Sequence, residues 1–156
     1  MLHSSSHYLI KKIEKMNSVH ILLVEDNEGD IMLTTEALED KRVVNKVSVV
    51  KNGKEAVDFV FGQGKYKDSE KPDLILLDVN LPLKNGHEVL QEIKSKDETR
   101  HIPVIMLTTS SSEQDINLSY KHHANCFITK PVAIQEFLDA VSSIEDFWLQ
   151  LVKLPK

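Results

Sequence analysis

The sequence predicts an α/β fold in which one five-stranded parallel sheet is covered by helices on both faces. Short apolar segments recur along the 156 residues, and stretches with helical periodicity lie between them. Within these segments apolar residues follow one another without alternation, which is typical of parallel strands buried on both faces. Since strand–helix–strand units are right-handed, a three-layer doubly wound domain is the simplest arrangement that satisfies both observations.

The first two strands lie in the first third of the chain. Residues 21–24 form the first strand, and Asn27 after it can cap a helix that extends to Leu38. Ile31 and Leu38 are one heptad apart, so they share a face of this helix. Residues 46–50 are rich in β-branched side chains and form the second strand.

The middle of the chain contains the second helix and the third strand. A turn at residues 52–53 precedes the helix, which ends at the glycine-rich break of residues 62–64. The charged segment 65–71 lacks periodicity, so we expect an exposed loop there. Residues 74–77 form the most apolar strand, and the next helical face consists of Val89, Leu90 and Ile93.

The last third of the chain contains two strands and two helices. Residues 104–107 and 126–129 form the strands, and the serines at 110–112 are start signals for a weaker helix between them. In the last helix, apolar residues recur in steps of three and four, at Ile134, Phe137, Val141, Ile144, Trp148 and Leu151. This apolar surface is wider than one sheet face requires, which predicts a dimer or partner surface.

Composition and charge exclude several classes of protein. The chain is 41% hydrophobic and 28% charged, and no apolar stretch approaches the length of a spanning helix, so we expect no membrane insertion. The net charge of −5 and the absence of a long basic run argue against nucleic acid as a ligand. The single cysteine, Cys126, is expected to be a small buried core residue. Residues 1–15 form an expected flexible leader or extension, and residues 16–156 one domain.

Four of the five strands end in residues that can carry chemistry. Glu25 and Asp26 follow the first strand, Asp78 the third, Thr108 the fourth and Lys130 the fifth. Because the carboxyl ends of parallel strands meet at one edge of the sheet, these side chains can meet at one site.

The chemistry of this group of residues favours a magnesium-dependent phosphoryl transfer. Two or three carboxylates suit Mg²⁺, which prefers oxygen ligands and often shares them with a phosphate. Asp78 is then the best nucleophile, since an aspartyl phosphate is a known covalent intermediate and a flexible segment follows it. Lys130 and Thr108 can hold the phosphoryl oxygens. The peptide bond before Pro131 can be cis, which would turn Lys130 toward the acids.

The chain resembles the receiver domain of two-component response regulators over residues 19–143. The matching segments are Ile21-Leu22-Leu23-Val24-Glu25-Asp26-Asn27, Asp73-Leu74-Ile75-Leu76-Leu77-Asp78-Val79-Asn80-Leu81-Pro82, Asn85-Gly86, Pro103-Val104-Ile105-Met106-Leu107-Thr108 and Phe127-Ile128-Thr129-Lys130-Pro131. The resemblance implies a flavodoxin-like topology with strand order 2-1-3-4-5.

The resemblance also implies a role for each site residue. Asp78 is the phosphoacceptor, Glu25 and Asp26 are the acidic pair, and Asn80 lends a backbone carbonyl to Mg²⁺. Thr108 is the switch hydroxyl, Lys130 the phosphate-binding amine, and Phe127 stands at the position of the switch aromatic. A phenylalanine there lacks the hydroxyl of tyrosine but keeps the ring that moves inward.

The C-terminal segment is similar to that of the small single-domain regulators paired with bacterial phytochrome-type histidine kinases. The similarity rests on Phe147-Trp148-Leu149, then Val152, Leu154 and Pro155, together with Thr108-Thr109-Ser110. It implies a cytoplasmic protein without an attached output domain, a sensor histidine kinase as partner, and a homodimer formed through the C-terminal helix face.

Two other interpretations remain open at this point. A phosphatase or phosphomutase of the haloacid-dehalogenase type also forms an aspartyl phosphate, but it needs an acid two residues after the nucleophile, where this chain has Asn80. A receiver that has lost phosphorylation would act only as an interaction module, although every expected site residue is present. We therefore expect a signalling switch that catalyses at most its own phosphorylation and dephosphorylation.

Overall fold

The five predicted strands form a single parallel sheet in the order β2-β1-β3-β4-β5, as expected from the resemblance. The computed structural model describes residues 19–39, 44–109, 123–124 and 126–142. Its strands are β1 (Val19–Val24), β2 (Val44–Val50), β3 (Leu74–Asp78), β4 (Val104–Thr108) and β5 (Cys126–Thr129). Its helices are α2 (Glu28–Leu38), α3 (Gly53–Phe61), α4 (Gly86–Lys94) and α6 (Ile134–Ser142).

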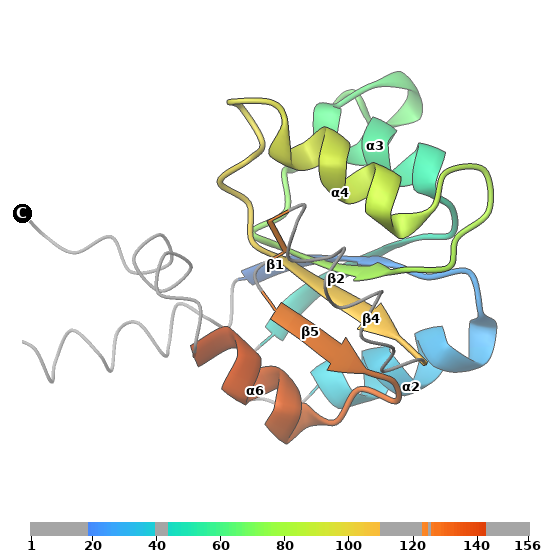
Figure 1. The fold of residues 1–156 in the computed structure, drawn as a ribbon, viewed down its shortest axis with the longest axis vertical. Helices are drawn as coiled ribbons and strands as arrows, with labels where there is room; N and C mark the ends of the chain where they lie inside the picture. Colours follow the sequence, from blue (N-terminus) through green and yellow to red (C-terminus); the bar gives the residue numbers. More distant parts are fainter. Residues whose placement is uncertain (1–18, 40–43, 110–122, 125, 143–156) are drawn as a thin grey trace, which may run out of the picture.

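The helices cover both faces of the sheet, so the domain has three layers (Figure 1). Helices α3 and α4 lie on one face, and α2 and α6 lie on the other. Successive residues of β1 point to opposite faces: Leu22 packs in the cluster under α3 and α4, and Leu23 in the cluster under α2 and α6. Both side chains are fully buried, which is why the strand must be apolar at consecutive positions.

Asparagines begin three of the described helices, α2, α3 and α4. The side chain of Asn27 accepts a hydrogen bond from the backbone N–H of Asp30 at the start of α2, at 2.9 Å. Asn52 caps α3 in the same way, and Asn85 forms a reciprocal capping box with Glu88 at the start of α4. Each cap satisfies a helix N–H that has no partner within its own helix. The caps therefore fix α2 and α4 close to the carboxyl ends of β1 and β3.

Gly86 allows α4 to begin directly against the end of β3. A Cβ atom at this position would lie 2.2 Å from the carbonyl oxygen of Asp78 and 2.8 Å from the Cα of Val79. The backbone N–H of Gly86 donates to the carbonyl oxygen of Val79 at 2.9 Å. A side chain at residue 86 would thus displace the backbone that carries Asp78.

Two expectations need correction. The segment 65–71 is not wholly a loop, because a short 3₁₀ helix, η1 (Gly64–Tyr66), begins it, and the ring of Tyr66 packs 5.0 Å from that of Phe59. Cys126 is half-buried rather than buried, since it lies on β5 at the edge of the sheet. Its Sγ atom lies 3.6 Å from the carbonyl oxygen of Ala140. The predicted helix after residue 110, the leader and the aromatic C-terminal segment lie outside the described residues.

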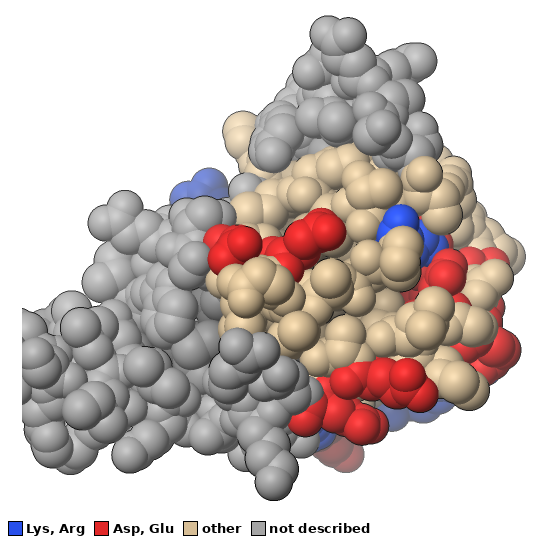
Figure 2. Space-filling model, turned by 90° about the horizontal axis from the view of Figure 1, so that it is seen from below, with Lys and Arg blue, Asp and Glu red and all other residues tan. Residues whose placement is uncertain are grey.

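Among the described residues, no helix is both long enough and apolar enough to cross a membrane. The face that carries α2 and α6 shows more acidic than basic side chains in its described part (Figure 2).

Candidate functional site

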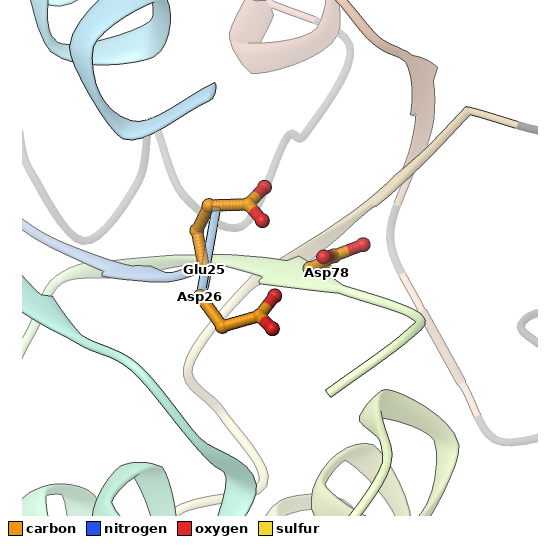
Figure 3. A group of neighbouring side chains, drawn as sticks. All are labelled: Glu25, Asp26 and Asp78. Carbon is orange, nitrogen blue, oxygen red and sulfur yellow. The ribbon is translucent and has the colours of Figure 1, made fainter. Parts of the chain in front are cut away.

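Glu25, Asp26 and Asp78 converge at the carboxyl edge of the sheet (Figure 3). Strands β1 and β3 are neighbours, and Val24 pairs with Leu77, so the residues that follow them lie at the same level. Each acid offers one oxygen, and these oxygens all lie within 4.8 Å of one another. Glu25 and Asp78 are buried and Asp26 is exposed, so the cluster is open to solvent on one side.

Lys130 joins this cluster from the end of β5. Its Nζ atom lies 2.7 Å from Oε1 of Glu25 and 3.4 Å from Oδ2 of Asp78, and its side chain is only 7% exposed. The backbone N–H of Lys130 donates to the carbonyl oxygen of Thr108 at 2.7 Å, which ties the end of β5 to that of β4. The bond between Lys130 and Pro131 is cis, the isomer that sequence alone could not decide.

Burial and charge shift the proton affinities of Glu25 and Lys130. Burial raises the pKa of Glu25 to about 7, and the nearby carboxylate of Asp78 acts in the same direction against the hydrogen bond from Lys130. Burial alone would lower the pKa of Lys130, but its hydrogen bonds to Glu25 and Asp30 and the charge of Asp78 raise it above its usual value. The amine is therefore a permanent cation in a site with surplus negative charge.

The three acids fit a small divalent cation. Octahedral Mg²⁺ holds oxygens at about 2.1 Å, so opposite ligands lie about 4.2 Å apart. The oxygens of Glu25, Asp26 and Asp78 lie within 4.8 Å of one another, so a cation can contact them after small side-chain movements. Cation binding would also offset the repulsion that raises the pKa of Glu25.

The remaining predicted residues surround this cluster at the ends of their strands. Thr108 is fully buried at the last position of β4 and pairs in register with Thr129. Asn80 is exposed, and its backbone N–H lies 3.4 Å from Oδ1 of Asp78. Phe127 lies half-buried on β5 and packs against the cluster under α3 and α4.

One residue of the site was missed by sequence reasoning. Asp30, in the first turn of α2, places Oδ2 3.0 Å from Nζ of Lys130. A signal was available, because Asp30 stands in the first turn of a helix that starts at the carboxyl edge. What sequence could not show is that Lys130, one hundred residues later, reaches it.

A doubly wound parallel sheet with three acids and a buried lysine at its carboxyl edge defines a class of α/β proteins equipped for divalent-metal and phosphate chemistry. Comparison with protein families makes the assignment specific. Residues 21–142 match the model of the response regulator receiver domain, and the chain belongs to this family. Receiver-domain response regulators are signalling switches, and the family is known to bind a divalent metal at an acidic site.

Individual relatives confirm the similarity to phytochrome-associated regulators. Response regulator Rcp1 of Synechocystis sp. is 44% identical over 135 residues, which cover 86% of this chain and 92% of Rcp1. A crystal structure of Rcp1 in its Mn²⁺-bound form is similar with a TM-score of 0.71 and 42% identity, over 89% of this chain and 100% of that one.

Two further solved structures support the same relationship. The phosphorylated cyanobacterial phytochrome response regulator RcpA is 46% identical with a TM-score of 0.72, over 88% of this chain and 99% of that one. The bacteriophytochrome response regulator AtBRR is 44% identical with a TM-score of 0.75, over 83% of this chain and 94% of that one.

Proposed function

We propose that Asp78 accepts a phosphoryl group from a phosphohistidine of a sensor kinase and that this modification switches a protein-interaction surface. The observation that carries the proposal is the arrangement around Asp78. The ammonium of Lys130 lies 3.4 Å from Oδ2 of Asp78, and the oxygens of Glu25 and Asp26 lie within 4.8 Å of the Asp78 carboxylate. A carboxylate nucleophile, a cation-binding pair of acids and a fixed amine are the parts that phosphoryl transfer requires.

In the proposed reaction, a carboxylate oxygen of Asp78 attacks phosphorus while the bond between phosphorus and the imidazole nitrogen breaks. The electron pair of that bond leaves with the imidazole, and the aspartyl phosphate remains on the protein. Bound Mg²⁺, held by Glu25, Asp26, Asp78 and the carbonyl oxygen of Asn80, would neutralise charge on the phosphoryl oxygens. Lys130 binds another phosphoryl oxygen through its ammonium group.

The proposed switch runs through Thr108 and Phe127. The phosphoryl group adds a charge of about −1.5 to −2 at neutral pH beside Asp78. The hydroxyl of Thr108 moves to bind it, and the half-buried ring of Phe127 then packs further inward. The surface formed by β4, the predicted helix after residue 110 and the last helix changes its affinity for a partner as a result.

The similarity to phytochrome response regulators extends the proposal to partners and location. A phytochrome-type histidine kinase is the proposed phosphodonor, and this donor implies a cytoplasmic protein. We also propose a homodimer through the C-terminal helix face and a domain that spans residues 16–156. Light scattering with and without a beryllofluoride phosphate mimic tests the dimer and its dependence on phosphorylation.

Labelling with a small phosphodonor tests the central step. Wild-type protein, Mg²⁺ and acetyl phosphate are expected to give one added phosphoryl group per chain by intact-mass spectrometry, and Asp78→Asn is expected to give none. Asp73→Asn is the matched control, because Asp73 lies beside the opposite end of β3 and its carboxylate accepts from the backbone N–H of His20 at 2.9 Å. Full labelling of Asp78→Asn would refute the assignment.

The same assay separates a switch from an enzyme. We propose that the chain is not a turnover enzyme, because Asn80 cannot supply the general acid that a phosphatase of the haloacid-dehalogenase type needs at this position. Phosphate esters are therefore expected to be left intact. Release of many phosphates per protein from such esters would instead establish a phosphatase.

A further inference from the structure

Asp30 contacts the central amine of the site, yet the proposed phosphoryl transfer gives it no role. Its Oδ2 atom lies 3.0 Å from Nζ of Lys130, and Oε1 of Glu25 lies 2.7 Å from the same atom. The two acids differ in burial: the side chain of Glu25 is 1% exposed and that of Asp30 is 29% exposed. Asp30 is therefore the outermost of the contacts made by Lys130.

A closed ring of hydrogen bonds links this contact to the start of α2. The backbone N–H of Asn27 donates to Oε2 of Glu25 at 3.2 Å, and the side-chain oxygen of Asn27 accepts from the backbone N–H of Asp30 at 2.9 Å. Lys130 closes the ring by donating to both Asp30 and Glu25. The first turn of α2 and the amine thus hold each other in place.

The contacts of Lys130 compete with a phosphoryl group for its N–H donors. An ammonium has three N–H donors. Two of them hydrogen-bond to Glu25 and Asp30, and Oδ2 of Asp78 lies 3.4 Å from the same nitrogen. A phosphoryl group on Asp78 carries more negative charge than the carboxylate, so it competes with Glu25 and Asp30 for the ammonium. Glu25 is buried and cannot exchange the amine for water, whereas the partly exposed Asp30 can.

We propose that Asp30 is a positioning residue that holds Lys130 in the unphosphorylated protein and releases it when Asp78 carries a phosphoryl group. This inference rests on the proposed function of Asp78. Asp30 competes with the phosphoryl group for the ammonium, so it weakens the phosphorylated state. Its release also removes one link that fixes the first turn of α2, so phosphorylation loosens this turn.

Asp30→Asn and Glu28→Gln form a matched pair of variants for the test. Both remove one negative charge from the first turn of α2, but Glu28 is 74% exposed and pairs with Lys51, away from Lys130. Asparagine keeps the size of Asp30 and competes only weakly for an ammonium. Titration with beryllofluoride in excess Mg²⁺ is expected to show roughly three- to tenfold tighter binding for Asp30→Asn, the effect of removing a competing charged hydrogen bond. Unchanged or weaker binding would overturn the proposal, and so would an equal gain in Glu28→Gln.

Hydrogen exchange in α2 provides a readout that a purely structural role would not produce. The amide of Ile31, which donates to the carbonyl oxygen of Asn27, is expected to exchange faster when beryllofluoride binds wild-type protein. In Asp30→Asn this amide is expected to exchange fast without beryllofluoride, and its exchange rate should change little when beryllofluoride binds. Equal responses in the two proteins would contradict the release of Asp30.

Failure of this inference is distinguishable from failure of the proposed function. If wild-type protein takes up no phosphoryl group at Asp78, the proposed function fails. If wild-type protein is labelled at Asp78, and Asp30→Asn matches it in beryllofluoride affinity and amide exchange, only the role of Asp30 fails.

Discussion

The carboxyl and amino edges of the sheet both hold buried polar side chains, but these side chains have different kinds of partner at the two edges. At the carboxyl edge, Lys130 lies within 3.4 Å of three carboxylates. At the amino edge, the buried side chain is His20, whose ring nitrogens lie 3.3 Å from the carbonyl oxygen of Lys71 and 2.8 Å from the hydroxyl oxygen of Ser48. The carboxylate of Glu70 lies 3.4 Å from Nδ1 of this ring and is largely exposed.

The difference separates a site that is prepared for a ligand from a network that supports the fold. The partners of His20 satisfy its nitrogens as a neutral ring, and the edge-on ring of Phe59 packs 5.8 Å away. The acids around Lys130 carry more negative charge than one amine can neutralise, and this excess remains until a cation arrives. Surplus buried charge, rather than a buried polar group as such, is what indicates function here.

Removal of Lys130 tests this contrast with the largest expected change in stability. In EDTA, Lys130→Met is expected to lower the free energy of unfolding by roughly 3 kcal/mol, because buried carboxylates lose their partner. Mg²⁺ should restore part of the loss by neutralising the same acids. Urea unfolding followed by circular dichroism measures both effects.

Lys46→Met is the control at the amino edge. Lys46 lies 3.8 Å from Glu70, and both side chains are more than half exposed, so the expected loss is below about 0.5 kcal/mol, with no response to Mg²⁺. Comparable losses of unfolding free energy in Lys130→Met and Lys46→Met would show that the carboxyl edge holds no excess of buried negative charge.

Gly86→Ala tests how closely the backbone at the carboxyl edge is packed. The added Cβ would lie 2.2 Å from the carbonyl oxygen of Asp78, so we expect a loss of about 1–3 kcal/mol and slower labelling of Asp78. Gly29→Ala is the control, since its Cβ would lie 3.2 Å from the side-chain oxygen of Asn27 and alanine favours a helix. Equal stability of Gly86→Ala and wild type would contradict this packing.

Much of this edge could be predicted from the sequence, because local signals and strand topology act together there. The apolar run before Asp78 marks a buried strand, the caps Asn27 and Asn85 mark helix starts, and parallel strands bring their carboxyl ends to one edge. Two features escaped this reasoning. The contact between Asp30 and Lys130 and the close approach of Gly86 to Asp78 depend on how separate elements pack.

The half-buried position of Cys126 is another feature that the sequence did not predict. Its neighbours in sequence resemble those of a central strand, and only the position of β5 at the edge of the sheet exposes it. The short helix η1 was missed because the contact between Tyr66 and Phe59 leaves no periodic pattern in a charged segment.

The pH dependence of stability in EDTA tests the charge excess through Glu25. Its folded pKa of about 7 lies above its unfolded value, so the native state binds more protons between about pH 4.5 and 7. The free energy of unfolding should therefore fall as the pH rises through this window, by at most about 1.4 kcal/mol per pH unit from this group. Urea titrations of wild type and Glu25→Gln measure the difference. If the free energy of unfolding falls with pH equally in Glu25→Gln and wild type, the raised pKa of Glu25 is contradicted. The control Glu28→Gln should show the same pH dependence as wild type.

The pH dependence of stability that arises from His20 should have the opposite sign to that from Glu25, and it should be the smallest of these effects. Burial lowers the pKa of its imidazole, against the hydrogen bond to the carbonyl oxygen of Lys71, so the unfolded state binds more protons just below pH 6.5. The contribution of His20 to stability is present above this pH and is lost as the pH falls through its folded pKa. The difference in unfolding free energy between wild type and His20→Gln, measured in one buffer series with Mg²⁺, should therefore shrink on acidification. A constant difference would mean that the amino edge tolerates a charged ring, and the contrast between the two edges would then rest on the acids alone.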